Sequence, residues 1–393
     1  MIHYFTVTAR DPIIARDSRP FGRGQGFRMR SLDWPYPSVL AGSLRTLLGK
    51  AHGGSFDAAM VKDLKSLAVA GPVPFLSNEL YFPKPFDAVG RPNGESIQVH
   101  SLRPMRCAGG EGCDLPAGLQ PVMLSPELVE DFKPAGLPDF WSATKMAQWL
   151  TDSRGASFPM LPNLSSSKPS WEAGFLGSPA KDERTHVSIS SDKGVAEDGE
   201  LFSTVGLDLW HKPLGVSVEI GLRVTANTAV PIFGGLHPFG GERRLAFWRD
   251  LGDVAPLWEC PERLRQQLAS SAHIRLVLAT PAFFAHGWKP RWLSSGPDGM
   301  QGSPPGTSVK LRLTAAAVDR WRPISGWSLE EGQVGIKPLR RLAPAGSVYF
   351  FEVLDGDRAT LARDGWLQPI SDDEQDRRDG FGLALWGIWE PHS

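Results

Sequence analysis

The fold begins with IHYFTVTA (residues 2–9) and PSVLAGSLRTLLGK (residues 37–50), which predict a strand and then a helix. The first segment alternates between two faces, as a strand does. In the second, four leucines between positions 40 and 48 recur at helical spacing. Ser38 is the expected N-cap, and Gly49 is the expected end of the helix.

The loop between these elements reads RDSRPFGRGQGFRMR (residues 16–30), with five arginines, three glycines and one acid, Asp17. The whole chain has 42 basic and 43 acidic residues, so this positive charge is local. Guanidinium groups match phosphate oxygens, and glycine lets another backbone approach closely. The loop therefore predicts a phosphate-binding segment. Phe21 and Phe27 either stack on bases or anchor the loop in the core, and Asp17 is itself a possible partner of the arginines.

Length and composition favour two domains with many loops. The chain has 393 residues, of which 41 % are hydrophobic, and it contains 42 glycines and 34 prolines. No apolar run approaches the roughly 20 residues of a membrane span, and the first residues lack the pattern of a signal peptide. Three cysteines are too few for a disulfide scaffold, so we expect a cytoplasmic protein.

Two α+β units follow from the pattern of strands and helices. We expect a first domain over residues 1–260 and a second over residues 261–393. Residues near 90–180 are rich in Pro, Gly and Ser and predict a long insertion in the first domain, with one helix near residues 141–150.

Sequence motifs for catalysis and for nucleotide binding are absent. Cys107 and Cys113, with His100, are candidate zinc ligands, although one cysteine pair is not a four-ligand site and a loop with exposed thiols is the simpler interpretation. His237 is a candidate general base for a metal-independent ribonuclease, with a structural role in a turn as the alternative. We expect no cofactor and no metal.

A combination of glycine and arginine recurs in three places, often with an aromatic ring that can stack on an unpaired base. The net charge of −1 argues against sequence-blind binding to long nucleic acid, but a confined RNA-binding patch is compatible with it. The candidate RNA-binding residues are Arg16, Arg19, Phe21, Arg23 and Arg28; His237, Gly240, Gly241, Arg243 and Arg244; and Arg340, Arg341, Gly380, Phe381 and Gly382.

Several blocks of the sequence resemble the RAMP proteins of CRISPR effectors, and in particular the third-subunit family of the type III-B Cmr complex. The blocks are DPIIARDSRPFG, PSVLAGSLRTLLG, FGGERRLAF, RRLAPAGSVYFFEV and DGFGLALWGIW, in that order and across nearly the whole chain. Residues 90–180 are the least covered. Ser18 departs from the glycine expected in this motif, which puts the tightness of that turn in doubt.

The resemblance implies two ferredoxin-like (RRM-like) domains with long loop insertions. It also implies a non-catalytic subunit that holds the repeat-derived 5′ handle of the guide RNA in antiviral defence. The implied protein partners are the large polymerase-like subunit and the backbone RAMP subunit. A guide-RNA processing endoribonuclease of the same fold is the alternative, and an adaptor that binds only proteins is a third possibility.

The resemblance also suggests roles for individual residues. Arg16, Arg19 and Arg23 would lie near the handle, together with the GGERR turn (residues 240–244). The final GFGLALWG has the look of the glycine-rich loop of RAMP proteins. Its glycines either receive the RNA backbone or only end the last helix, and both interpretations stay open.

Overall fold

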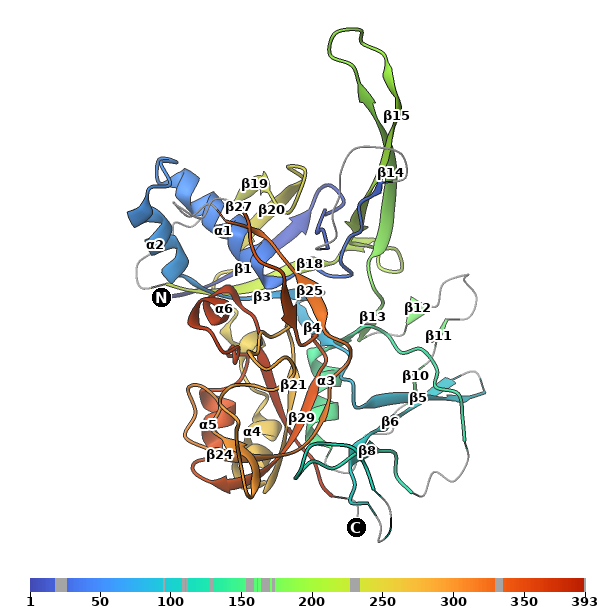
Figure 1. Ribbon diagram of the computed structural model, residues 1–393, viewed down its shortest axis with the longest axis vertical. Coiled ribbons are helices and arrows are strands. Elements are labelled where there is room, and N and C mark those ends of the chain that lie inside the picture. The colour runs from blue at the N-terminus through green and yellow to red at the C-terminus, as the bar shows by residue number, and fades with distance from the viewer. Residues whose placement is uncertain are drawn as a thin grey trace. The chain divides into compact units, whose positions relative to one another are not determined.

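The computed structural model describes residues 1–17, 27–94, 96–107, 110, 112–126, 131–152, 159–160, 162–163, 170–171, 174–226, 234–328 and 335–391. The chain is a mixed α and β protein built on antiparallel sheets (Figure 1). It divides into two compact units, and each unit is assembled from three separate stretches of sequence. Unit 1 comprises Met1–Pro72, Ser178–Gly252 and Pro323–Arg341, and unit 2 comprises Val73–Gly177, Asp253–Arg322 and Leu342–Ser393.

The central strand of unit 1 is β1 (Ile2–Ala9), which confirms the first predicted strand. It pairs antiparallel with β18 (Glu219–Thr225) on one side and with β20 (Leu245–Asp250) on the other. The sheet continues through β3 (Ala68–Leu76) beside β18 and through β19 (Gly235–Pro238) beside β20. The residues of β3 from Val73 onward are part of unit 2. Phe5 and Val7 of β1 are fully buried in the core of the unit.

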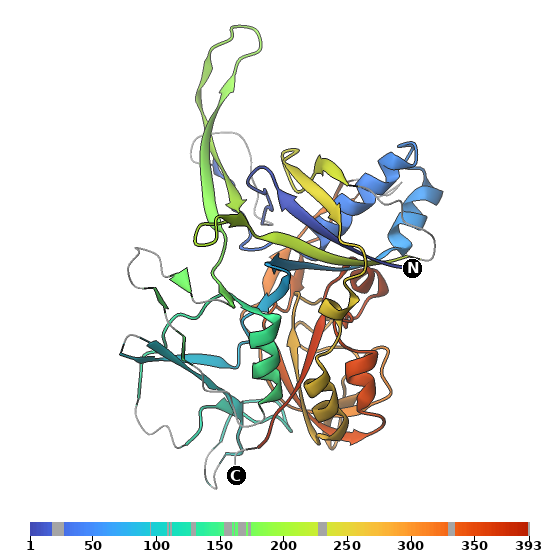
Figure 2. The same ribbon diagram turned by 180° about the vertical axis from the view of Figure 1, so that it is seen from behind.

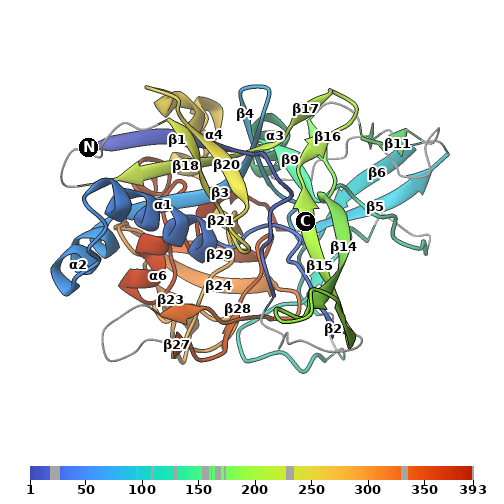
Figure 3. The same cartoon turned by 90° about the horizontal axis from the view of Figure 1, so that it is seen from above.

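The predicted helix is α1 (Pro37–Ala51), and it lies with α2 (Ala58–Ser66) on one face of this sheet (Figure 3). Leu40, Leu44 and Leu48 of α1 belong to the same buried cluster as Phe5 and Val7. The predicted helix ends need correction. Tyr36 is the N-cap, without a side-chain hydrogen bond, and Pro37 in the first turn has no N–H to leave unsatisfied.

Gly49 lies inside α1 and does not end it. A Cβ there would lie 2.4 Å from the Phe56 ring, so this glycine provides space for packing.

A long hairpin belongs to unit 1. It is formed by β14 (Ala180–Ile189) and β15 (Ala196–Asp208), and it extends well beyond the sheet as a narrow ribbon (Figures 1 and 2). Near its base, β2 (Phe27–Arg28) pairs with β15 in parallel. The remaining elements of unit 1 are short: β16 (Trp210–His211), β17 (Val216–Ser217), β26 (Trp327–Ser328), β27 (Gly335–Ile336), β25 (Arg322–Ile324) and β28 (Arg340–Leu342), the last two continuing one residue into unit 2.

Unit 2 contains a six-stranded sheet in the order β22-β23-β24-β29-β21-β30. Its strands are β21 (His273–Leu278), β22 (Ser294–Gly296), β23 (Gly299–Gly302), β24 (Lys310–Ala317), β29 (Val348–Asp355) and β30 (Ala384–Ile388). Its helical elements are the 3-10 turn η1 (Ala255–Trp258), α4 (Glu262–Ser270), α5 (Ala359–Arg363) and α6 (Glu374–Asp379).

Residues 73–177 also belong to unit 2, whereas the sequence predicted an insertion in the first domain. The stretch contains α3 (Ala143–Thr151), close to the predicted helix, which contacts α4 and β30. Its strands are β4 (Glu79–Pro83), β5 (Ala88–Asn93), β6 (Ser96–Ser101), β7 (Arg103–Pro104), β8 (Val122–Met123), β9 (Phe140–Ser142), β10 (Pro159–Met160), β11 (Pro162–Asn163), β12 (Ser170–Trp171) and β13 (Phe175–Leu176).

A buried ion pair explains why this stretch belongs to unit 2. Asp87 Oδ2 accepts from Arg275 Nη1 of β21 at 2.8 Å, and Asp87 Oδ1 accepts from Trp149 Nε1 of α3 at 2.9 Å. Arg275 also donates to the backbone carbonyls of Trp149 and Asp152. Contacts of this kind between residues almost 190 positions apart are not visible in sequence patterns.

Within the described ranges, no helix has both the length and the apolar character that are needed to cross a membrane.

Candidate nucleic-acid interface

The segment that enters the arginine loop is held against the base of the β14–β15 hairpin. Ile13 and Leu207 exchange two backbone hydrogen bonds, of 2.9 and 2.7 Å. A Cβ on Gly206 would lie 2.7 Å from Cβ of Pro12, so only glycine allows this approach without a shift. The hairpin therefore fixes the path of the chain before Arg16.

The GGERR turn lies on the same segment. Gly241 N–H donates to the Ile14 carbonyl at 2.8 Å, and Arg10 N–H donates to the Leu245 carbonyl at 3.0 Å. Gly240 has φ +77°, and a Cβ there would lie 2.6 Å from the Ile14 oxygen. The structure therefore brings together two of the three predicted patches, and these two glycines serve the close contact between two protein backbones.

The segment that leaves the loop returns beside the one that enters it. Leu32 N–H donates to the Ala15 carbonyl at 2.8 Å, and Asp17 N–H donates to the Arg30 carbonyl at 3.0 Å. The Arg16 residue is exposed, and its backbone forms an isolated antiparallel β-bridge with the backbone of Ser31. The predicted residues Arg19, Phe21 and Arg23 lie outside the described residues.

The arginines of this region differ in their partners. Arg28 forms an ion pair of 2.5 Å with Glu183 of the hairpin, and Arg16 also has a contact. By contrast, the exposed Arg30 and Arg243 and the half-buried Arg244 of this region have no side-chain hydrogen bond or ion pair with any described residue. The exposed guanidinium groups of Arg30 and Arg243 are therefore available to an anionic ligand, whereas Nε of Arg244 is buried without a partner among the described residues.

Arg10 completes this group and was missed from sequence. It is exposed, it follows β1 directly, and its side chain has no partner within the described part of the chain. Its position at the end of the first strand was the available signal. We call Arg10, Arg30, Arg243 and Arg244 the arginine cluster.

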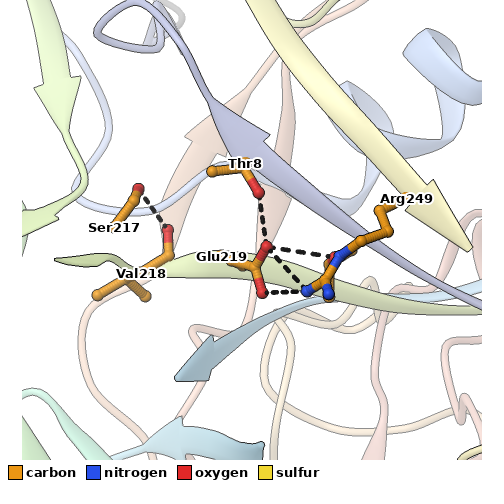
Figure 4. A network of polar contacts seen from close by, with 6 residues as sticks. Thr8, Ser217, Val218, Glu219 and Arg249 are labelled. Carbon is orange, nitrogen blue, oxygen red and sulfur yellow. Dashed lines mark hydrogen bonds and ion pairs between the residues drawn. The ribbon is translucent and has the colours of Figure 1, made fainter. Parts of the chain in front are cut away.

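Phe247 was also missed. It lies on β20 with 47 % of its surface exposed, whereas Ala246 and Trp248 on either side are fully buried. Beside it, Glu219 joins β1, β18 and β20 by accepting from Thr8 Oγ1 at 2.6 Å and pairing with Arg249 at 3.0 Å (Figure 4). Strand alternation places the exposed Phe247 on the face opposite to the core.

His237 lies on β19, and its ring has no hydrogen bond with any described residue. A general base is usually oriented by a second group, and the structure describes no such group here.

Arg340 and Arg341 are exposed and lie on β28, which forms a two-stranded ribbon with β25. Both arginines have contacts of their own.

The prediction for residues 380–382 needs correction. Gly380 N–H donates to the Arg377 carbonyl and Phe381 N–H to the Asp376 carbonyl, which is the Schellman ending of a helix, here α6, with Gly380 at φ +96°. Gly382 N–H donates to Pro281. These N–H groups are therefore bound to protein carbonyls, and of the two open interpretations the geometry matches helix termination.

Phe381 is only 2 % exposed, and its ring lies 4.7 Å from that of Phe283. A ring in that position is packed in the core and is not available to stack on a base. Gly387, from the same motif, lies within β30, where a Cβ would meet Leu150.

The cysteines and His100 form no recognisable metal site. Within the described ranges no group of three His, Cys, Asp or Glu residues is arranged to hold a metal ion. Cys107 and Cys113 are exposed. Cys260 is buried, and burial raises its pKa to about 12, so its thiol stays protonated at neutral pH.

The chain is similar to chains of several solved structures of CRISPR complexes. One is a chain of "Cryo-EM structure of the Type III-B Cmr-beta bound to cognate target RNA and AMPPnP, state 1", at 15 % identity over 88 % of this chain and 86 % of that one, with a TM-score of 0.44. Another belongs to "Crystal structure of Csm3-Csm4 subcomplex in the type III-A CRISPR-Cas interference complex", at 10 % identity over 99 % and 100 %, with a TM-score of 0.37. No curated protein matches.

A family match over nearly the whole chain defines the class of the protein: it is a CRISPR-associated protein. Residues 5–389 match the family described as "CRISPR-associated protein (Cas_Cmr3)", and the chain belongs to that family. The resemblance to the third-subunit family of the Cmr complex is thereby confirmed.

Proposed function

We propose that this subunit is a non-catalytic RNA-binding protein that holds the repeat-derived 5′ handle of the guide RNA. In this proposal it works in the cytoplasm, in antiviral defence, and it docks the large polymerase-like subunit onto the backbone RAMP subunit. The observation that carries the proposal is that the segments entering and leaving the arginine loop are hydrogen-bonded to one another, and that the entering segment is also hydrogen-bonded to the GGERR turn. Backbone hydrogen bonds join these segments, which carry the four residues of the arginine cluster.

The fold is consistent with two ferredoxin-like domains. In unit 1 the strands β1, β3, β18 and β20 lie in the order β3-β18-β1-β20, and in unit 2 the strands β21, β24, β29 and β30 lie in the order β24-β29-β21-β30. When the four strands of each unit are numbered in chain order, both sheets have the strand order 2-3-1-4. We take this shared order as support for two related α+β domains.

The test replaces Arg243 and Arg244 together by alanine in the assembled effector complex. Each lost charge-assisted contact should cost about 1–3 kcal/mol, and the salt dependence of RNA binding should weaken by about one unit of slope per phosphate contact. We therefore expect less guide RNA per complex after co-purification and a flatter salt dependence.

A matched control removes two exposed arginines of unit 2, Arg263 and Arg320, which also lack side-chain partners within the described ranges. This control changes the net charge equally and should leave the guide RNA content unchanged. Equal guide RNA content in the Arg243→Ala/Arg244→Ala complex and the wild type would contradict the proposal.

The non-catalytic part of the proposal has its own test. Incubation of the purified protein with repeat RNA in the presence of a metal chelator should leave the RNA intact. Cleavage at one site that is lost in His237→Ala would favour the endoribonuclease. RNA crosslinks from the segment 16–30 in the native complex would argue against a pure protein adaptor.

A further inference from the structure

On the side of β20 and β19 that faces away from the core of unit 1, two exposed apolar side chains, Phe247 and Leu236, lie next to the half-buried Thr8 of β1. Phe247 of β20 lies opposite Thr8 of β1 on one side and opposite Leu236 of β19 on the other. Phe247 is 47 % exposed and Leu236 is 41 % exposed. We call these three residues the stacking face. Exposed apolar side chains that adjoin one another on a surface are typical of sites where a ligand or a partner binds.

Polar contacts hold the surroundings of this ring in place. Arg249, two residues along β20, is paired with Glu219, and Glu219 also accepts from Thr8 (Figure 4). The guanidinium group of Arg249 is still half exposed. One border of the stacking face is therefore a fixed, planar, cationic group next to an aromatic ring.

The other border is the arginine cluster. Arg10 belongs to this cluster, and its N–H donates to the carbonyl of Leu245, two residues before Phe247 on β20. Because Thr8 lies opposite Phe247, strand alternation places the exposed Arg10 on the same side of the strands as the ring. The nearby acid Asp11 is occupied, because its carboxylate accepts from Leu245 N–H at 3.1 Å. Arg10, Arg243 and Arg244 have no comparable partner among the described residues. An exposed aromatic ring therefore lies between cationic groups at both ends.

We propose that the stacking face binds one unpaired base of an RNA strand, stacked on Phe247, while the arginine cluster binds the adjoining phosphates. Single-stranded RNA has the matching chemistry, since it combines a polyanionic backbone with flat rings, and cationic grooves with aromatic side chains are the usual way to bind it. The inference rests on the proposed RNA-binding function and adds the site at which a base is held.

The experiment uses the full chain and a fluorescein-labelled, single-stranded RNA of about ten nucleotides with the repeat-derived 5′ sequence. A series of the same RNA carries one abasic nucleotide at each position in turn. Binding is followed by fluorescence anisotropy at several salt concentrations. The variants are Phe247→Ala, Phe247→Trp, and Leu354→Ala as a control for an exposed apolar residue on a sheet of unit 2.

Phe247→Ala should bind the intact RNA about 5- to 150-fold more weakly, without a change in salt slope. An abasic nucleotide at one position of the RNA should weaken binding to the wild type by a similar factor. The Phe247→Ala variant should bind this abasic RNA and the intact RNA with the same affinity. Phe247→Trp, which keeps a stacking ring, should bind like the wild type, and so should Leu354→Ala.

The proposal is overturned if Phe247→Ala binds like the wild type, or if no abasic position is coupled to Phe247. The second outcome would point to a protein partner on this face. Failure of this site is distinguishable from failure of the proposed function. If Arg243→Ala/Arg244→Ala still weakens RNA binding, only the proposed base-binding site is rejected. If the wild-type protein does not bind the RNA at all, both the base-binding site and the proposed RNA-binding function are rejected.

Discussion

At the scale of single residues, the pair of Asp87 and Arg275 is the most informative. Both are fully buried, and their side chains join β21 to α3 and to the loop before β5. Burial opposes both charges: it raises the pKa of Asp87 and lowers that of Arg275, while the direct ion pair acts in the opposite direction on each. A buried pair of this kind is costly to break, because removing one partner leaves an uncompensated charge.

We therefore expect Asp87→Asn to lower the free energy of unfolding by about 3–5 kcal/mol. The amide keeps the size of the side chain and can still accept from Trp149, so the loss reports mainly the missing counter-charge of Arg275. The double variant Asp87→Asn/Arg275→Met should recover part of the loss. The measurement is urea-induced unfolding followed by tryptophan fluorescence.

A surface pair serves as the control. Asp319 and Arg322 are exposed and 3.7 Å apart, so Asp319→Asn should change stability by less than about 1 kcal/mol. If Asp87→Asn were no more destabilising than this control, the ion pair would not be what holds residues 73–177 in unit 2.

At the scale of elements, the GGERR turn depends on backbone geometry more than on charge. Glu242 and Arg243 have φ values of +56° and +52°, which is the left-handed region, and Gly240 lies against the Ile14 carbonyl. The turn thereby places Arg243 and Arg244 beside residues 10–14, which lead into the arginine loop.

The variant Gly240→Ala tests this geometry. Its Cβ would collide with the Ile14 oxygen, so the turn must move and the hydrogen bond from Gly241 to Ile14 must lengthen or break. We expect a loss of stability of about 1–3 kcal/mol together with weaker RNA binding. Thermal unfolding and RNA anisotropy would measure the two effects.

Gly252→Ala is the matched control. Gly252 also has a positive φ, +66°, but a Cβ there would meet nothing within 4 Å. This variant carries the conformational strain without the collision, so it should destabilise less and leave RNA binding unchanged. Equal effects of the two variants would show that the close approach to Ile14 is unimportant.

At the scale of the whole molecule, both units are discontinuous in sequence. A cut after residue 260 separates residues 73–177 from the rest of unit 2, including α4 and β30, which α3 contacts. Asp87 would then lose Arg275, and the apolar side of α3 would be exposed to water.

We expect the fragment 1–260 to aggregate or to bind a hydrophobic dye when expressed alone. Co-expression with residues 261–393 should restore a soluble pair, because the two fragments together contain all of unit 2. Analytical gel filtration and dye fluorescence would check this. A monomeric fragment 1–260 with a cooperative unfolding transition would instead support the domain boundary predicted from sequence.

The sequence by itself determined the local elements and the family. Leucine spacing identified α1, alternation identified β1, and motif blocks identified the Cas_Cmr3 family, since these signals depend only on neighbours along the chain. It also marked the arginine loop and the GGERR turn as related in chemistry. It could not show that the segment before the loop, residues 10–14, lies beside this turn, because hydrogen bonds over more than 200 positions join the two.

Only the tertiary structure decided which marked residues are accessible. Phe381 and Phe247 look alike in sequence, yet the first packs in the core and the second faces solvent. Gly380 ends a helix, and residues 73–177 belong to unit 2. The physical reason is the same in each case: burial and pairing are set by contacts between distant segments, whereas sequence patterns report only the local backbone.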